Sequence, residues 1–276
     1  MIKTLKAQYK HHHLILAGIL LLTFILRFPS LFEPFWYGDE GIFAAVARNL
    51  NLGGTLYATA WDNKPPMIYL TYAAIFKFFG VSMFWLHLTA AVTILATAVM
   101  IYEIAQGLLG EKRALIATAV FGILTSLRLI EGNLALTEIF MILPISAAIL
   151  IAVKRKFDFI SLFAAGFLFA IASLYKQVGA FEAAALGIFL FLYIKNFKDF
   201  ILRGIILSIG FAVLYAPTVL YFYSKHLLSD YIFAAYTYYR IYLGESPKYA
   251  QLITVLKFTP ILAAICYGGF KKFKEK

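Results

Sequence analysis

The chain is poor in charged residues and has a single cysteine. Asp, Glu, Lys and Arg make up only 14% of its 276 residues, whereas 62% are hydrophobic. Cys266 has no second cysteine to pair with, so an intrachain disulfide is excluded. The mean hydropathy of +0.82, with 27 Phe and 18 Tyr, lies outside the range of soluble domains. The composition therefore predicts an all-α polytopic membrane protein.

The first apolar run, 14–26, has the features of a retained signal-anchor helix. Lys3, Lys6 and Lys10 precede it, as basic residues precede the apolar core of a signal peptide. The segment 27–30 that follows reads Arg-Phe-Pro-Ser and lacks the small residues of a signal-peptidase site. We therefore expect this helix to remain in the protein.

Apolar runs long enough to cross the hydrocarbon of a bilayer recur along the chain. We predict about eight spans, at 14–28, 82–107, 113–129, 134–153, 158–175, 178–194, 201–223 and 250–270. A further apolar stretch, 66–80, is short and contains Lys77. We predict an interfacial amphipathic helix there rather than a span.

The basic residues follow the pattern expected of such a topology. With eight spans, most of the 25 Lys and Arg fall on one side, in 3–10, 112–113, 154–156, 195–203 and 271–276. The positive-inside rule makes this side cytoplasmic and places both termini there. Attraction to anionic lipid explains the net charge of +11, so nucleic-acid binding is not needed to account for it.

The other side, predicted to be external, collects most of the residues that could do chemistry. Its first loop, 29–81, is rich in acids, and its last, 224–249, is rich in tyrosine. Tyrosines at this depth are typical of an interfacial aromatic belt, although stacking on sugars is an alternative. No predicted span carries the buried series of charges that an ion pathway needs.

Asp39, Glu40 and Lys64 are the most informative residues of the first loop. Asp39 and Glu40 begin a stretch with helical apolar spacing, 41–50, which the segment 51–54 ends. An acid at this position can be a simple cap, but in so apolar a chain it is also a candidate active-site acid. The prolines after Lys64 hold it in an extended conformation, which suits a phosphate head group; an interfacial lysine is the alternative.

Three further polar residues lie at the external ends of later spans. Lys176 and Gln177 occupy the tight turn between the fifth and sixth spans, where the topology disfavours a basic residue. Glu138 falls about one turn inside the fourth span, and we expect it to face protein or water because contact with lipid would be costly.

These residues resemble a known family. The pattern W-Y-G-D-E-x-x-F-A-x-x-A-R-N-L at 36–50, followed by D-N-K-P-P at 62–66 and an apolar helix ending in F-G, is similar to the GT-C glycosyltransferases. Within this superfamily it is most similar to the branch of protein O-mannosyltransferases and lipid A aminoarabinose transferases. The resemblance runs from about 14 to about 195 and is most specific in the first loop.

The resemblance implies a single GT-C-type transmembrane domain over 1–276, with juxtamembrane helices in 29–81. It implies transfer of one hexose or pentose from a polyprenyl-phosphate donor to an acceptor hydroxyl of a lipid, glycan or protein. The reaction would occur outside the cytoplasm, with inversion. Asp39 corresponds to the catalytic acid of the family, and Lys64 and Lys176 would bind the donor phosphate. Glu40, Glu138 and Gln177 are expected to help bind or position substrate.

The resemblance says less about a cofactor and about partner proteins than about the reaction. No His or Cys ligand set is present, and the branch mostly works without a metal, but Asp39 and Glu40 could share a weak divalent cation with the donor. Many family members carry an extracytoplasmic C-terminal domain for acceptor selection. We expect no separate soluble domain here, so a partner subunit could supply that role.

Two other function classes remain open from the sequence. The first is a transporter or flippase of lipid-linked sugar intermediates, which should show internal repeats and broken helices near the membrane midplane. The second is a non-catalytic GT-C-like subunit. The presence of Asp39, Lys64 and Lys176 favours the enzyme.

Overall fold

The computed structural model describes residues 2–244 together with 256 and 259, and in this part of the chain the fold is built from helices alone. The end of the tyrosine-rich loop, Cys266, the basic segment 271–276 and all of the predicted eighth span 250–270 except residues 256 and 259 lie outside the described residues.

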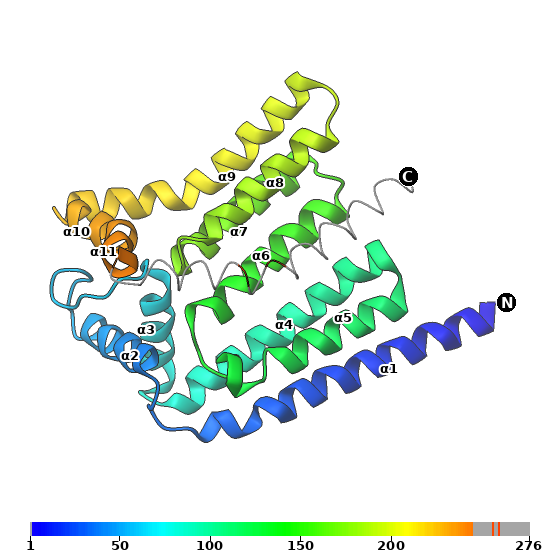
Figure 1. Ribbon diagram of the computed structural model, residues 1–276, viewed down its shortest axis with the longest axis horizontal. Helices are drawn as coiled ribbons and strands as arrows, with labels where there is room; N and C mark the ends of the chain where they lie inside the picture. Colours follow the sequence, from blue (N-terminus) through cyan, green and yellow to red (C-terminus); the bar gives the residue numbers. More distant parts are fainter. Residues whose placement is uncertain (1, 245–255, 257–258, 260–276) are drawn as a thin grey trace.

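The long helices run side by side in alternating directions (Figure 1). They are α1 (Ile2–Arg27), α4 (Met83–Leu109), α5 (Glu111–Leu124), α6 (Thr137–Lys154), α7 (Phe159–Tyr175), α8 (Gly179–Tyr193) and α9 (Phe197–Ser224). The shorter helices gather at the end of the bundle where α1 ends and α4 begins. They are α2 (Gly38–Asn51), α3 (Met67–Phe79), α10 (Leu228–Ile232) and α11 (Tyr238–Gly244).

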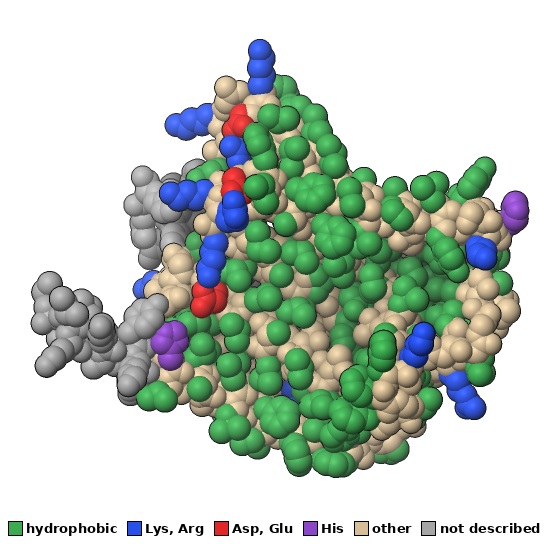
Figure 2. All heavy atoms as spheres, turned by 180° about the vertical axis from the view of Figure 1, so that it is seen from behind, with side chains coloured by type: hydrophobic (Ala, Val, Ile, Leu, Met, Phe, Trp, Pro, Cys, Tyr) green, Lys and Arg blue, Asp and Glu red, His purple; other side chains and the backbone are tan. Residues whose placement is uncertain are grey.

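The helices have the length and composition of a helical membrane protein. Four segments are long and apolar enough to span a bilayer, namely His12–Phe32, Met83–Leu109, Thr137–Lys154 and Phe197–Ser224. The apolar helices α3, α7 and α8 are shorter. Figure 2 shows one face of the molecule covered by hydrophobic side chains, with charged side chains gathered mainly along one edge.

The predicted span 113–129 extends beyond the end of its helix. α5 ends at Leu124, and its 14 residues cover about 21 Å at 1.5 Å per residue, less than the hydrocarbon thickness of about 30 Å. The guanidinium of Arg27 donates hydrogen bonds to the carbonyl oxygens of Thr125 (2.5 Å) and Gly132 (2.6 Å). Arg27 thus stabilises a turn where the local hydropathy predicted more helix.

The predicted helices of the first loop are present. α2 covers the predicted stretch 41–50, and α3 covers almost all of 66–80. α3 ends at Gly80, whose φ of 81° lies in the region that favours glycine. α2 and α3 pack against each other, and a buried cluster including Phe43, Tyr69 and Tyr72 joins them to the start of α4.

Two glycines allow α7 and α9 to pack closely. A methyl group at Gly166 would clash with the carbonyl oxygen of Leu207, and one at Gly210 would clash with the carbonyl of Phe163. The backbones of the two helices are therefore in direct contact, as is common where small residues face each other between membrane helices. This contact holds the first half of α7 against the middle of α9.

Candidate active site at one end of the bundle

Asp39 lies in the first turn of α2 with a partly open side chain. Tyr37 occupies the N-cap position, and its side chain forms no capping hydrogen bond. The Asp39 carboxylate is 45% exposed, and its Oδ2 lies 3.9 Å from the Nζ of Lys64. The structure thus brings together the acid and the first lysine predicted for the site, and leaves the acid accessible.

The backbone around Lys64 is held by two tyrosines. The hydroxyl of Tyr57 donates to the carbonyl of Lys64 (2.7 Å), and the backbone N–H of Lys64 donates to the hydroxyl of Tyr69 (3.2 Å). Tyr69 in turn donates to Asp62 Oδ2 (2.7 Å). Burial raises the pKa of both Tyr57 and Tyr69 above the ordinary value, so both phenols keep the protons that these bonds require. Lys64 is therefore presented from a fixed loop.

The described part of the tyrosine-rich loop packs onto the first loop. Trp61 and Tyr238 meet edge to face with ring centroids 5.1 Å apart, and the Lys64 ammonium lies 6.0 Å from the ring centroid of Tyr239. Tyr231 is buried and stacks on Phe222 with centroids 4.5 Å apart. Some of these tyrosines are thus core or site residues, a role that the sequence did not distinguish from an aromatic belt.

Glu40 has an environment very different from that of Asp39. Its side chain is fully buried, and its Oε1 lies 2.8 Å from Nε2 of His87 in α4. The same oxygen accepts a hydrogen bond from the backbone N–H of Ala135 (2.7 Å). Nδ1 of His87 contacts the carbonyl oxygen of Ser30. Because that carbonyl can only accept, Nδ1 carries a proton.

This environment revises the expectation for Glu40. A fully buried carboxylate bonded to His87 and Ala135 cannot contact a substrate in this structure or share a cation with Asp39. In the part of the chain that the structure describes, no group of three or more His, Cys, Asp or Glu could hold a metal ion. Glu40 instead joins α2 and α4 to the segment before α6, which places it among positioning residues.

Glu138 and Lys176 form the second ion pair of the site. Lys176 caps the C-terminal end of α7, and its Nζ donates to Oε1 of Glu138 in the first turn of α6. The hydroxyl of Thr137 donates to the other carboxylate oxygen (2.7 Å). Both charged side chains are partly exposed. Gln177 follows in the turn, and its buried Oε1 has no hydrogen-bond partner within the described chain.

Tyr37 joins the first loop to the segment before α6. Its hydroxyl donates to Oε2 of Glu131 (2.8 Å). That hydrogen bond, partial burial and the negative charges of Glu131, Asp39 and Glu138 raise the pKa of Tyr37 to about 12. The hydrogen bond to Glu131 thus holds the first loop against the segment that leads into α6.

A hydrogen bond also ties α7 to α3. The hydroxyls of Tyr175 and Thr71 lie 2.7 Å apart, and the ring of Tyr175 stacks on Phe140 with centroids 5.8 Å apart. Since Tyr175 directly precedes Lys176, and α3 begins three residues after Lys64, these contacts fix the second lysine against the helix that follows the first.

An apolar cavity of about 510 Å³ lies among α2, α3, α7 and α9. It is lined by Leu50, Leu56, Pro66, Met67, Leu70, Leu174, Leu214, Pro217, Thr218, Tyr221 and Phe222. In the chain, Pro66 follows Lys64 by two residues and Leu174 precedes Lys176 by two. The arrangement can hold a ligand with an anionic head and an apolar tail.

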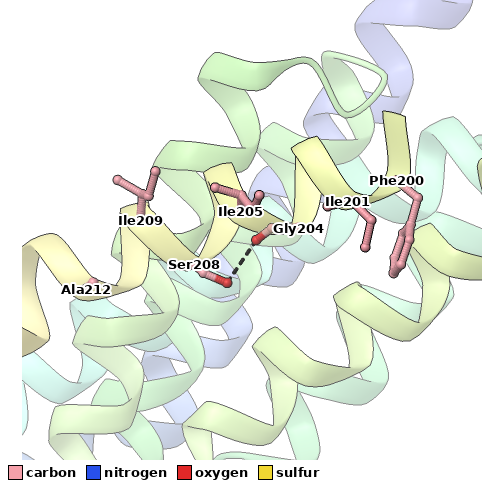
Figure 3. A pocket seen from close by; sticks show the side chains of 7 residues that line it. All are labelled: Phe200, Ile201, Gly204, Ile205, Ser208, Ile209 and Ala212. Carbon is pink, nitrogen blue, oxygen red and sulfur yellow. Dashed lines mark hydrogen bonds between the residues drawn. The ribbon is translucent and has the colours of Figure 1, made fainter. Parts of the chain in front are cut away.

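A second apolar groove, on the surface of α9, has a different character. Figure 3 shows its lining side chains between Phe200 and Ala212, around a hydrogen bond from Ser208 to the carbonyl of Gly204 (2.8 Å). No titratable side chain lines it. It is therefore not a candidate catalytic site.

Comparison of the chain with protein-family models, with curated proteins and with solved structures found no match. The functional assignment therefore depends on the residues and geometry of this chain itself.

Proposed function

We propose that the chain is a membrane glycosyltransferase that takes a single sugar from a polyprenyl-phosphate donor. The observation that carries this proposal is the accessible carboxylate of Asp39, 3.9 Å from Lys64. An apolar cavity is lined by Pro66, two residues after Lys64, and by Leu174, two residues before Lys176. The cavity suits the apolar tail of such a donor, the lysines suit its phosphate, and the carboxylate suits the acceptor hydroxyl that attacks the sugar. The GT-C-type fold, with about eight spans, is part of the same proposal.

The reaction is a substitution at the anomeric carbon of the donor. The acceptor hydroxyl forms a new bond to this carbon while the bond from the carbon to the phosphate oxygen breaks. Asp39 accepts the proton of the acceptor hydroxyl as the attack proceeds. Lys64 and Lys176 stabilise the negative charge that develops on the leaving polyprenyl phosphate. Attack from the face opposite the phosphate inverts the anomeric configuration.

The remaining residues position these groups. Tyr57 and Tyr69 hold the backbone of Lys64, and Glu138 holds Lys176 through an ion pair. The charge distribution of the sequence supports an extracytoplasmic site with both termini in the cytoplasm, in a multi-pass protein of the cell membrane. A partner subunit could select the acceptor.

The decisive experiment compares donor turnover by wild type and Asp39→Asn. Purified full-length protein is supplied with polyprenyl-phosphate sugars, and the release of polyprenyl phosphate is measured. Loss of the base should lower the rate by about 100-fold or more, with an unchanged unfolding temperature. Glu103→Gln is the matched control, because Glu103 pairs with Lys154 near the far end of α4 and should leave the rate unchanged.

Three results would contradict the proposal. Equal rates for wild type and Asp39→Asn would remove Asp39 from the mechanism. Absence of turnover by wild type with every donor tested would favour a non-catalytic subunit. Movement of an intact lipid-linked sugar between the leaflets of a vesicle, without release of polyprenyl phosphate, would favour a flippase.

A further inference from the structure

A separate pocket lies where the C-terminal ends of α2 and α3 meet the chain before α4. Its volume is about 430 Å³, and it is lined by Arg48, Leu50, Asn51, Leu52, Phe76, Lys77 and Val81. None of the residues proposed for glycosyl transfer takes part in it. The side-chain amide of Asn51 donates to the carbonyl of Ala73 (2.9 Å), which ties the end of α2 to α3.

The pocket contains two cations and no acid. Arg48 lies in the last turn of α2 and Lys77 in the last turn of α3. In the part of the chain that the structure describes, neither forms an ion pair with a carboxylate. A basic residue in each last turn complements the dipole of its own helix. That effect does not require both cations to line one pocket, where a single bound anion can interact with both.

The surroundings of the pocket place it at the level of lipid head groups. Val81 lies two residues before Met83, where the candidate span α4 begins. Leu52, Phe78 and Val81 are 79%, 76% and 60% exposed. A ring of exposed apolar side chains beside two cations at the end of a span is suited to an amphiphile rather than to a soluble anion.

We propose that this pocket binds the phosphodiester head group of an anionic phospholipid from the surrounding bilayer. The guanidinium of Arg48 can form two parallel hydrogen bonds to the phosphate, and the ammonium of Lys77 supplies a second charge. The exposed apolar side chains contact the acyl chains. The inference goes beyond glycosyl transfer and does not depend on it.

The pocket adjoins the apolar cavity described above. Leu50, in the last turn of α2, lines both spaces. A phospholipid bound at Arg48 and Lys77 therefore supports the same helix end that forms part of the cavity wall. Occupancy of the lipid site should stabilise the packing of α2 on α3.

The test measures lipid binding by the purified full-length protein with native mass spectrometry. Detergent-solubilised protein is titrated with phosphatidylglycerol or with phosphatidylcholine, and the lipid adducts are counted. We expect wild type to retain phosphatidylglycerol in preference to phosphatidylcholine. In Arg48→Gln/Lys77→Gln the affinity for phosphatidylglycerol should fall about tenfold, because charge-assisted hydrogen bonds are lost, while that for phosphatidylcholine should not change.

The matched control is Lys225→Gln/Arg240→Gln, which removes two exposed charges from the same end of the bundle but not from the pocket. It should bind phosphatidylglycerol as wild type does. Equal loss in this control, or no loss in Arg48→Gln/Lys77→Gln, would overturn the proposal. Displacement of bound phosphatidylglycerol by millimolar inorganic phosphate, but not by chloride, would overturn the assignment to a phospholipid in favour of a soluble anion.

Discussion

The Nε2 atom of His87 lies 2.8 Å from Oε1 of Glu40, and both side chains are completely buried. Nδ1 of the ring donates to the carbonyl of Ser30, and Nε2 shares a proton with the carboxylate of Glu40. Glu40 directly follows Asp39 in the chain. The pair therefore fixes the start of α2, and with it the position of the proposed base, against α4.

Removal of this carboxylate should be strongly destabilising. Glu40→Ala leaves His87 and the N–H of Ala135 buried without their partner, and we expect the free energy of unfolding to fall by about 3–5 kcal/mol. The measurement is the unfolding transition of the purified protein in detergent. The control is Glu103→Ala, which breaks an exposed ion pair and should cost about 1 kcal/mol or less. Similar losses in the two variants would contradict a structural role for the pair.

Hydropathy predicted the positions of the helices well, because apolar runs without charges can be stable in a bilayer only as helices. The end of α5 was less predictable. The predicted span continues to residue 129, but the guanidinium of Arg27, nearly 100 residues earlier in the chain, bonds to the turn that follows Leu124. Such a long-range hydrogen bond leaves no periodic signal in the sequence.

The sequence indicated which residues belong to the candidate site but not which of them contact each other. Scarcity of charge indicated Asp39, Lys64, Glu138 and Lys176, yet the contact between Glu138 and Lys176 depends on how α6 packs against α7. His87 was missed because one histidine in an apolar run is commonly a core residue. It is nevertheless the only ionisable residue in the first half of α4, and that isolation was a usable signal.

The role of Lys176 can be separated from its ion pair with Glu138. If Lys176 binds the donor phosphate, both Lys176→Gln and Lys176→Gln/Glu138→Gln should lower donor turnover by about 100-fold. The double variant leaves no unpaired charge, so it tests whether an orphaned carboxylate causes the loss. Recovery of turnover in the double variant would restrict Lys176 to a structural role. Lys154→Gln, near the far end of the bundle, is the control and should retain full activity.

The apolar cavity should accommodate the polyprenyl tail of the donor. Leu214→Trp adds volume to a residue that lines it, so the apparent affinity for a long-chain donor should fall while a short-chain analogue is turned over as before. The measurement is the KM for the two donors. Ile209→Trp introduces the same side chain on α9 outside this cavity and should change neither value. Equal effects on the long and short donors would place the tail elsewhere.

The hydrogen bond from Tyr37 to Glu131 predicts a pH dependence of stability. The pKa of Tyr37 in the folded protein is raised to about 12, above the ordinary value of about 10. The protonated phenol is therefore favoured by folding. The contribution of the protonated Tyr37 phenol to the free energy of unfolding is fully present below pH 10 and is lost as the pH rises through 12. Tyr37→Phe should thus lower stability near neutral pH, by about 0.5–1 kcal/mol for a hydrogen bond at the surface.

The measurement is the difference in unfolding temperature between wild type and Tyr37→Phe from pH 7 to pH 11. The difference should be constant up to about pH 10 and then decrease, because wild type loses the proton that the variant never had. Tyr223→Phe, at a tyrosine that is 67% exposed, is the control and should show no difference at neutral pH. A difference between Tyr37→Phe and wild type that grows with pH would require a folded-state pKa below 10. The hydrogen bond from Tyr37 to Glu131 would then not hold the phenol in its protonated form.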